Sequence, residues 1–202
     1  MRTRRSARQQ ALLDGLIEIF LAEGFSHFSV EDLAARLQCS KSTLYALAPS
    51  KEQLITAVVR AFFRRAAERV ELHLATEAEP THRIGAYLHA IAAELAPASS
   101  TFYRDLSAFA PAREIYWQNT AIAARRVQEL VSAAERPDRP VRANFIGAVA
   151  AQMMESIQQG RMKALTSLDD ATAYSALADL IVAGVAGASR NPRGGAQRSA
   201  AS

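Results

Sequence analysis

The chain has a single cysteine. Because Cys39 is the only one among 202 residues, no intramolecular disulfide can form and no thiolate cluster can bind a metal ion. Glycine-rich phosphate loops and nucleophile motifs are also missing from the sequence. The four histidines lack metal-ligand spacing (His27, His73, His82 and His89). We therefore predict no metal, no cofactor and no enzyme activity, and a reducing, cytoplasmic location.

Long apolar runs are missing too. The most apolar segment, Phe145–Met154, is bounded by Arg142 and Glu155 and contains Gln152. It is too short for a membrane helix, which needs about 20 apolar residues. The N-terminus is basic, but Asp14 interrupts the segment that follows, so we predict no signal peptide and no membrane partner.

Acidic residues are missing from both ends of the chain. Arginines stand at positions 2, 4, 5 and 8 before the first acid, Asp14, and at positions 190, 193 and 198 after the last one. Taking these seven charges from the net charge of +4 leaves −3 on the segment between Asp14 and Gly187. Positive charge on two flexible ends can reach phosphates. The alternative is that these ends only keep the protein in solution.

Helical periodicity runs through almost the whole chain, and no segment alternates as a strand does. The first helix carries Leu12 and Phe20 on one face and ends at Gly24. Capping residues then open three helices: Ser29 a short one, Ser40 a helix from Lys41 to about Leu47 that ends before Pro49, and Ser50 a long one that ends by Glu77–Pro80. Further helices are expected at about 81–95, 101–109, 112–134, 141–163 and 168–185.

The predicted fold class is therefore all-α, with two domains. Residues 1–50 form a three-helix head with a basic arm at 1–8, and residues 51–187 form a larger helical body. Residues 188–202 are rich in glycine, serine, alanine and arginine, which predicts a disordered tail.

The head has the proportions of a helix-turn-helix over Val30–Leu47, although its turn, Gln38-Cys39-Ser40, lacks glycine. The first turn of the second helix carries Lys41, Ser42 and Thr43, where a recognition helix contacts base edges in the major groove. Leu44 and Leu47 are spaced to anchor this helix, which leaves Tyr45 free. The alternative is an ordinary hairpin of two helices.

Several segments in matching order resemble the N-terminal signature of the tetracycline-repressor family. These are Gly24-Phe25, Ser29-Val30, Leu33-Ala34, Ser40-Lys41-Ser42-Thr43-Leu44-Tyr45 and Ser50-Lys51-Glu52-Gln53-Leu54, so the resemblance covers about Ala11–Val58. It implies a homodimeric transcriptional regulator, usually a repressor, which binds double-stranded DNA. It also implies that the larger domain binds a small-molecule effector.

The resemblance assigns DNA contacts residue by residue. They are Arg4, Arg5, Ser29, Ser40, Lys41, Ser42, Thr43, Tyr45 and Lys51. The family pattern continues after Tyr45 with a second tyrosine, a histidine and a phenylalanine, where this chain has Ala46, Leu47 and Ala48. Two usual DNA contacts are thus missing, and we expect the basic arm to compensate by reaching along the duplex.

Aromatic residues cluster in the body. We predict an apolar effector pocket, in which His89, Tyr103 or Gln118 orients a polar group of the ligand. Its predicted residues are Phe62, Tyr87, His89, Phe102, Tyr103, Tyr116, Trp117 and Met153. The alternative is that this aromatic stripe is ordinary core.

The last two helices are predicted to form the dimer interface as a four-helix seam. Their apolar stripes are Phe145, Val149, Met153 and Ile157 on one helix, and Leu177, Leu180, Ile181 and Val185 on the other. Burial within one chain is the alternative. The predicted mechanism is a homodimer that binds a near-palindromic operator and is released by its effector. A helical protein that acts through protein contacts without DNA, and an enzyme or small-molecule carrier, are the competing interpretations.

Overall fold

The computed structural model describes residues 2–134 and 140–189, with side chains at 7–80, 82–134 and 145–183. All regular secondary structure in this part of the chain is helical, which confirms the predicted fold class. The helices are α1 (Arg2–Glu23), α2 (Val30–Arg36), α3 (Lys41–Tyr45), α4 (Lys51–Leu74), α5 (Pro80–Leu95), α6 (Ser100–Ala108), α7 (Ala110–Ala133), α8 (Pro140–Gln158), α9 (Arg161–Thr166) and α10 (Asp170–Ser189).

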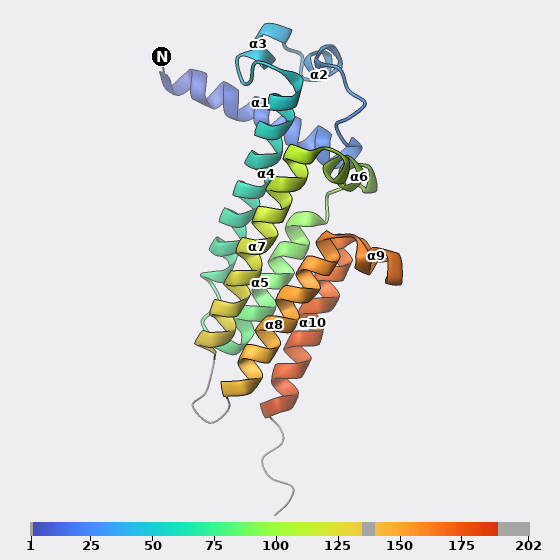
Figure 1. Ribbon diagram of the computed structural model, residues 1–202. Coiled ribbons are helices and arrows are strands. Elements are labelled where there is room, and N and C mark those ends of the chain that lie inside the picture. Colours follow the sequence, from blue (N-terminus) through green and yellow to red (C-terminus); the bar gives the residue numbers. More distant parts are fainter. Residues whose placement is uncertain (1, 135–139, 190–202) are drawn as a thin grey trace, which may run out of the picture.

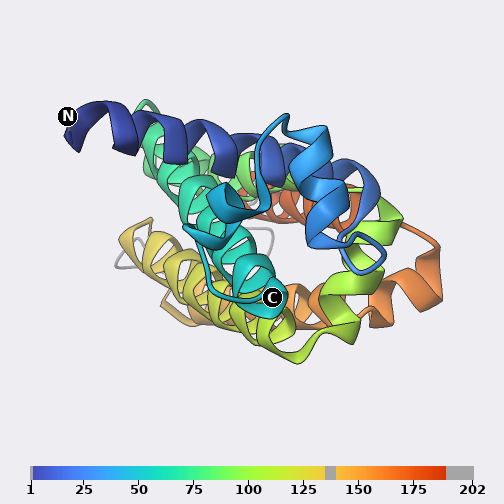
Figure 2. The same cartoon turned by 90° about the horizontal axis from the view of Figure 1, so that it is seen from above.

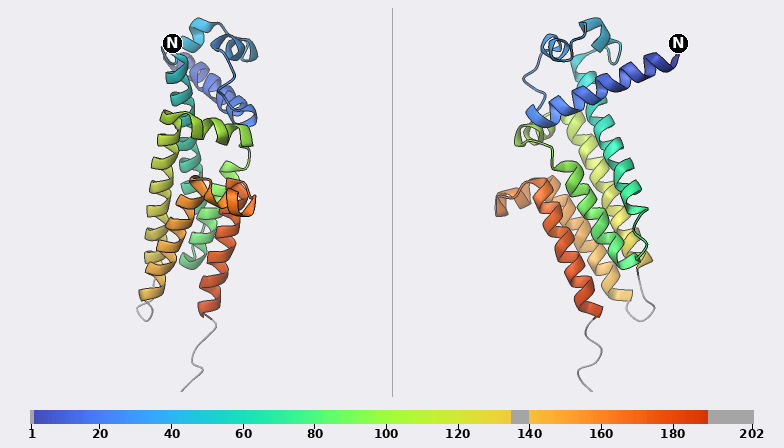
Figure 3. Two further views of the ribbon diagram at one scale, coloured as in Figure 1. Left: turned by 45° about the vertical axis from the view of Figure 1, so that its right-hand side comes forward. Right: turned by 180° about the vertical axis from the view of Figure 1, so that it is seen from behind.

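The helices form a small head at one end of a long bundle (Figure 1). The head consists of α1–α3, and α4 runs from it along the bundle beside α5 and α7, while α8 packs on α7 and α10 packs on α5. Seen from above, α1–α3 lie across the end of the bundle (Figure 2). The side views place α6 between the head and the body, while α9 projects from the side of the bundle (Figure 3). None of the helices in the described part is long and apolar enough to cross a membrane.

Serine side chains begin three of the helices at the predicted positions. The Ser29 hydroxyl accepts the N–H of Asp32, while the Asp32 carboxylate accepts the N–H of Ser29 at 2.8 Å. Ser40 accepts the N–H of Thr43 at 3.2 Å, and Ser50 accepts the N–H of Gln53 at 3.2 Å. Each cap satisfies an N–H that has no partner within its own helix.

Both ends of the chain are more helical than predicted. The basic arm is not a flexible end, because α1 already begins at Arg2. The side chains of Arg4 and Arg5 lie outside the described residues, so their contacts with DNA stay predictions. At the other end, α10 continues to Ser189, two residues into the predicted tail, and positions 190–202 lie outside the described residues.

The single helix predicted over 141–163 is instead two helices. Gly160 adopts a left-handed conformation with φ +72°, so α8 ends at Gln158 and α9 begins at Arg161. A left-handed residue breaks the hydrogen-bond ladder of an α-helix, and glycine adopts it without steric cost. The apolar periodicity alone could not show this break.

One continuous hydrophobic core joins the head to the body. The fully buried Leu33 and Leu44 of the head belong to the same cluster as Leu54, near the start of α4, and Leu74, at its end. Because α4 contributes buried residues along its whole length, a movement of this helix displaces core side chains in both the head and the body. The predicted domain boundary at residue 50 therefore falls within a shared core and stays a prediction.

Candidate DNA interface and body cavities

The recognition helix α3 lies at the end of the head that faces away from the body (Figure 1). Leu44 is fully buried and anchors the helix, whereas Lys41 and Ser42 are exposed and Thr43 is half-buried. The Tyr45 side chain is 47% exposed. The residues predicted to contact DNA therefore lie on the open face of α3, while the contacts themselves stay predictions.

Hydroxyl groups gather at the beginning of α3. Ser40 Oγ lies 2.8 Å from Ser42 Oγ and 2.8 Å from Thr43 Oγ1. Hydroxyls both donate and accept hydrogen bonds, so this cluster can meet either a phosphate or a base edge. Ser29 differs, because its hydroxyl is already bonded to the Asp32 carboxylate at 2.6 Å. The hydroxyl of Ser29 therefore serves as the N-terminal cap of α2.

The two lysines of the predicted interface already have partners. The Lys41 ammonium pairs with the Glu31 carboxylate of α2, and this hydrogen bond is the main reason why the pKa of Glu31 is lowered. Lys51 Nζ donates to the carbonyl oxygen of Ser26 at 2.9 Å. Lys51 therefore fastens the loop between α1 and α2, and Lys41 reaches a phosphate only in competition with Glu31.

A groove of about 290 Å³ separates α1 from α3, lined by Arg8, Gln9, Leu12, Ser42, Thr43 and Ala46. The exposed Arg8 stands in this groove together with Ser42 and Thr43, although the predicted DNA contacts did not include it. The sequence did contain a signal that Arg8 lies in this groove. Arg8 precedes Leu12 by four residues, so the two side chains lie on the same face of α1. At Ala46, where the family has a larger residue, the groove stays open.

The turn between α2 and α3 uses a residue that is poorly suited to its conformation. Gln38 has φ +49°, in the left-handed region that favours glycine. The chain then turns back so that the Cys39 N–H donates to the carbonyl of Ala34 at 2.9 Å. The turn of a helix-turn-helix normally favours glycine, and in this chain Gln38 adopts the left-handed conformation that a glycine would adopt without steric cost.

A buried carboxylate of α6 connects the head to the body. Asp105 is 4% exposed, and it accepts the N–H of Phe25 at 2.7 Å, the N–H of Ser26 at 2.9 Å and the Ser26 hydroxyl at 2.8 Å. Burial opposes ionisation, but the bonds from Ser26 and Phe25 outweigh it and lower the pKa of Asp105. Gly24 has φ +80°, and a Cβ there would lie 2.5 Å from the Asp105 carboxylate.

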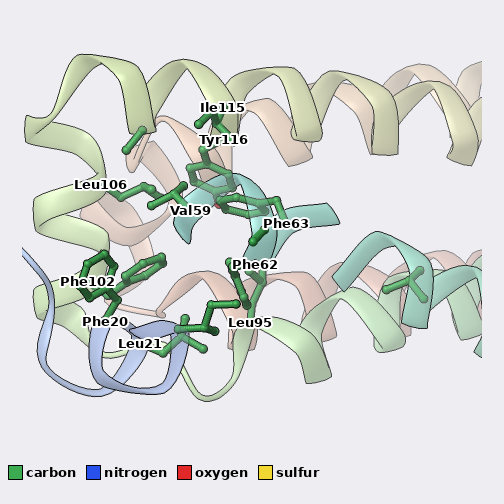
Figure 4. Close-up of a cluster of buried hydrophobic side chains, with 14 of the residues drawn as sticks. Phe20, Leu21, Val59, Phe62, Phe63, Leu95, Phe102, Leu106, Ile115 and Tyr116 are labelled. Atoms are coloured by element: carbon green, nitrogen blue, oxygen red, sulfur yellow. The ribbon is translucent and has the colours of Figure 1, made fainter. Parts of the chain in front are cut away.

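Two of the predicted pocket residues are part of the core between head and body. Phe62 of α4 and Phe102 of α6 are buried with ring centroids 5.9 Å apart, and Phe102 lies 6.1 Å from Phe25. Figure 4 shows Phe62 and Phe102 beside Phe20. For these residues the alternative of ordinary core is the one that the structure supports.

The remaining predicted pocket residues are divided between separate places. Tyr87 and Tyr116 line a cavity of only about 80 Å³ between α4, α5 and α7, which Tyr174 also lines. A cavity of that size has room for a few water molecules but not for a drug-sized ligand. His89 is exposed on α5 and lies 3.0 Å from Asp179 of α10, and Met153 is half-buried on α8. The eight predicted residues thus do not meet in one cavity.

A larger cavity of about 330 Å³ lies between α6, α7 and the α8–α9 turn, within the range of small-molecule sites. Three predicted residues, Tyr103, Tyr116 and Trp117, line it. The sequence did not identify its charged lining, which consists of Arg104, Arg113, Lys163 and Asp170. These residues come from four helices, so their proximity leaves no local signal in the sequence.

Asp170 is the buried acid of this larger cavity. It is 8% exposed, and the Tyr116 hydroxyl donates to its carboxylate at 2.6 Å. Burial raises the pKa of Asp170, and the hydrogen bond from Tyr116 offsets this only in part. The adjacent Asp169 caps α10 by accepting the N–H of Thr172 at 2.8 Å, so two acids that look equivalent in the sequence have different roles.

The predicted dimer stripes are only partly exposed. Ile157, Leu177 and Ile181 are buried within the chain, which corrects their assignment to an intermolecular seam. Phe145 and Leu180 point outward, 68% and 66% exposed. Val149 and Met153 are half-buried, and the side chain of Val185 lies outside the described residues. The correction arises because α10 turns its Leu177 and Ile181 face toward the bundle.

The cavities hold no arrangement for metal chemistry in the described part of the chain, where no three His, Cys, Asp or Glu residues group closely enough to bind an ion. The wall of the larger cavity is instead cationic and aromatic. The head and the body thus differ in their open surfaces, with an exposed helix that carries hydroxyl groups at the head and an aromatic, cationic cavity in the body.

Comparison with known proteins supports the same division. Residues 12–58 match the family model of bacterial regulatory proteins of the tetR family. No curated protein matches the chain. The family match covers α2, α3 and adjoining parts of α1 and α4, which is where the predicted DNA contacts other than Arg4 and Arg5 lie.

Solved structures of regulators share the whole fold. A transcriptional regulator from Saccharomonospora viridis in complex with choline has a TM-score of 0.67 at 14% identity, covering 87% of this chain and 96% of that one. A TetR-like regulator from Rhodococcus sp. RHA1 has a TM-score of 0.58 at 19% identity, with coverage of 89% and 96%. A TetR-family regulator from Mesorhizobium loti has a TM-score of 0.60 at 14% identity, with coverage of 92% and 98%. At these identities the likeness to solved structures establishes the fold, and the family match identifies residues 12–58 as the N-terminal, DNA-binding helix-turn-helix domain of tetR-family regulators.

Proposed function

We propose that the protein is a ligand-responsive repressor, which binds a near-palindromic operator as a homodimer and is released by a small-molecule effector. The observation that carries this proposal is the open face of α3. Lys41 and Ser42 are exposed on it, Leu44 holds the helix from behind, and Arg8 stands across the adjoining groove. A helix presented in this way fits the major groove of duplex DNA.

The contacts on the duplex divide into two kinds. The hydroxyls of Ser40, Ser42 and Thr43 are placed to reach base edges or phosphates, whereas Lys41 and Arg8 supply positive charge for the backbone. Tyr45 lies at the end of α3, where a phosphate contact suits its exposed ring. The proposed backbone contacts also include Arg4, Arg5 and Lys51. Lys51 would use the ammonium N–H groups that do not donate to Ser26.

A second copy of the chain is proposed to cover the outer face of α8 and α10. Phe145 and Leu180 are large apolar side chains that water surrounds in the isolated chain. Ala176 and Ala183 are exposed on the same helix as Leu180 and leave room for close approach of a partner helix. Related by a two-fold axis, two such faces make a self-complementary interface and present two heads to the DNA.

The effector is proposed to bind in the body and to act without chemical change. The S. viridis regulator was solved with choline, which supports binding of a small molecule by a bundle of this fold. An effector that favours a different position of the head lowers DNA affinity, and a coupling of roughly 1–3 kcal/mol is usual. We also propose that the protein acts in the cytoplasm, where operator DNA is present, and is not an enzyme.

One competing function has specific support. The ammonium of Lys41 is paired with Glu31, that of Lys51 is bonded to Ser26, and Ala46 replaces a larger residue of the family. The two lysine contacts weaken the electrostatic attraction of the head for DNA and Ala46 removes a contact, which would suit a regulator that acts through protein contacts instead.

Selection of bound duplexes from a random pool separates the two functions. We expect an inverted repeat, because a symmetric dimer reads two equivalent half-sites. Lys41→Ala should weaken binding to the recovered duplex and flatten its salt dependence by about one unit of log K against log salt. Arg161→Ala, which removes an exposed arginine of α9, is the matched control and should change neither. Recovery of no enriched sequence, by a protein that is folded and dimeric, would favour the protein-contact function.

A further inference from the structure

We infer that the 330 Å³ cavity between α6, α7 and the α8–α9 turn is the effector site, and that its ligand is an organic anion with an aromatic ring. This inference rests on the proposed function, since it names the ligand class of a ligand-responsive regulator. It is carried by the aromatic and cationic residues that meet in this cavity.

The aromatic part of the ligand is suggested by the walls of the cavity. Tyr103 and Trp117 both line it, from α6 and α7. The Trp117 side chain is 45% exposed, so the chain covers its ring only in part. A flat unsaturated ligand buries apolar area against such rings and gains the favourable geometry of ring pairs.

The anionic part of the ligand is indicated by the charge of the lining. The lining of the cavity carries three positive side chains and one carboxylate. The positive side chains are those of Arg104, Arg113 and Lys163, and the carboxylate is that of Asp170. Neither Arg104 nor Lys163 has a carboxylate within ion-pair distance among the described residues, although the charge of Lys163 favours the ionised forms of Asp169 and Asp170. Arg113 donates one N–H to the carbonyl of Ser107 at 2.8 Å, and a guanidinium has further donors that remain for a ligand.

The acid of the cavity cancels only part of this positive charge. Asp170 is one carboxylate among three cations, and it already accepts a hydrogen bond from the Tyr116 hydroxyl at 2.6 Å. A further donor lies in the same wall, because Gln158 Nε2 is buried and has no hydrogen-bond partner in the described part of the chain. An unpaired buried donor is costly, and a ligand carboxylate would satisfy it.

A quaternary ammonium ligand does not fit the same lining. Such a ligand binds on the faces of aromatic rings that no other cation occupies. Here the guanidinium of Arg113 lies 5.6 Å from the centroid of the Trp117 ring, and Arg104 and Lys163 add repulsion. The charge preference of this cavity is therefore opposite to that of a choline site.

The position of the cavity connects it to the head. Tyr103 and Arg104 line it, and the next residue of α6 is Asp105, which holds the backbone of Phe25 and Ser26. A ligand that draws Arg104 toward its carboxylate therefore acts on the helix that fixes the end of α1. This is a short physical route from the cavity to the DNA-binding head.

Direct titration of the full chain tests the inference without DNA. Trp117 is the only tryptophan, so its fluorescence reports on the cavity wall. The probes are phenylacetate, its neutral counterpart phenylacetamide, and choline. We expect phenylacetate to bind at least about tenfold more tightly than the amide, and choline to bind more weakly than either, because a carboxylate pairs with the cations that repel choline.

Variants locate the binding site. Arg113→Gln and Lys163→Gln should each weaken phenylacetate binding by about tenfold, since each removes one cation from the lining. Arg60→Gln, which removes an exposed arginine of α4, is the matched control and should bind as the wild type does. If loss of the Ser107 contact unfolds the Arg113 variant, Arg104→Gln takes its place, because Arg104 is exposed and forms no ion pair in the described chain.

Three results would overturn the inference: equal affinity for acid and amide, choline as the tightest probe, or unchanged affinity in both lining variants. Binding to the selected duplex is measured separately on the same protein. Duplex binding without preference for the anion would refute the ligand class and leave the regulator function intact. Preference for the anion without duplex binding would refute the regulator function alone.

Discussion

The carboxylate of Asp105 accepts the backbone N–H of Phe25 at 2.7 Å, across a separation of 80 residues in the sequence. Asp105 belongs to α6, and Phe25 follows the end of α1, so this bond fastens the head to the body. Phe25 reinforces the junction with its ring, whose centroid lies 6.1 Å from that of Phe102, also on α6. The buried Asp105 carboxylate is thus the polar contact that, together with the shared hydrophobic core, fixes the orientation of the DNA-binding head.

Substitution of Asp105 should destabilise the protein in proportion to the hydrogen bonds that it loses. Asp105→Ala leaves two backbone N–H groups without a partner and should lower the free energy of unfolding by about 2–4 kcal/mol. Asp105→Asn keeps an acceptor for them and should cost about 1 kcal/mol. Urea unfolding measures both. Asp179→Ala, which removes an exposed acid, is the control; an equal loss in that variant would contradict the role of Asp105.

The two buried acids should give stability opposite dependences on pH. The pKa of Asp105 is lowered, so its contribution is present above the ordinary value of 3.8 and is lost as the pH falls through the lowered pKa. The pKa of Asp170 is raised, so its contribution falls as the pH rises from 3.8 through the raised pKa. Asp170→Asn should therefore be at least as stable as the wild type at pH 7, and its advantage should shrink toward pH 4. An advantage that grows on acidification would refute this assignment.

Gln38 offers a stabilising substitution. Its left-handed conformation costs a side-chain-bearing residue energy that glycine does not pay, so Gln38→Gly should raise the free energy of unfolding by about 0.5–1 kcal/mol. Gln38→Ala removes the same side chain but keeps a Cβ, and should bring no gain. Thermal unfolding of the three proteins decides the matter; equal midpoints for the glycine and alanine variants would show that the backbone is not strained there.

The head could be predicted closely from the sequence because its signals are local. Ser29, Ser40 and Ser50 each cap a helix within three residues of themselves, and the structure places all three caps as expected. The positive φ at Gln38 could not be predicted, since no glycine marks it. The resemblance predicts Lys51 as a phosphate contact, and what the sequence could not show is that its ammonium group also donates to the carbonyl of Ser26, 25 residues away.

The body was predicted less well because its signals are not local. Phe62, Phe102 and Trp117 all lie on apolar helix faces, and periodicity does not show that the first two fill the junction while the third lines a cavity. The break at Gly160 could not be predicted, because a single glycine in a helical pattern does not indicate whether its backbone is left-handed. The bond between Asp170 and Tyr116 could not be predicted, because the two residues are 54 positions apart in the sequence.

Removal of Glu31 should strengthen duplex binding. The Glu31 carboxylate pairs with Lys41 and lies near the face of α3, where it competes with phosphates. Glu31→Gln should raise affinity for the selected duplex by roughly three- to tenfold, because it removes a negative charge that repels phosphates and frees the Lys41 ammonium from a competing partner. Glu68→Gln, an exposed acid of α4, is the control. Weaker binding by the Glu31 variant would mean that the pair positions Lys41 for DNA.

Charge on the outer face of α8 or α10 should abolish the dimer. Phe145→Glu and Leu180→Glu each place a carboxylate in the proposed interface, where its desolvation is costly. Sedimentation should show monomers, with duplex affinity reduced by at least about a hundredfold because one head alone binds weakly. Leu72→Glu, which substitutes a leucine of α4 that is 69% exposed, should stay dimeric. Dimers of normal stability in both interface variants would place the interface elsewhere.

Hydroxyl-radical footprinting of the dimer on its selected duplex tests the central claim most directly. If a symmetric pair of chains presents α3 twice, two protected patches should appear on one face of the duplex. Their centres should lie about 34–36 Å apart, one helical turn, or a whole multiple of that distance. Lys41→Ala should weaken both patches equally. A single patch, or uniform protection that Lys41→Ala leaves unchanged, would contradict the account.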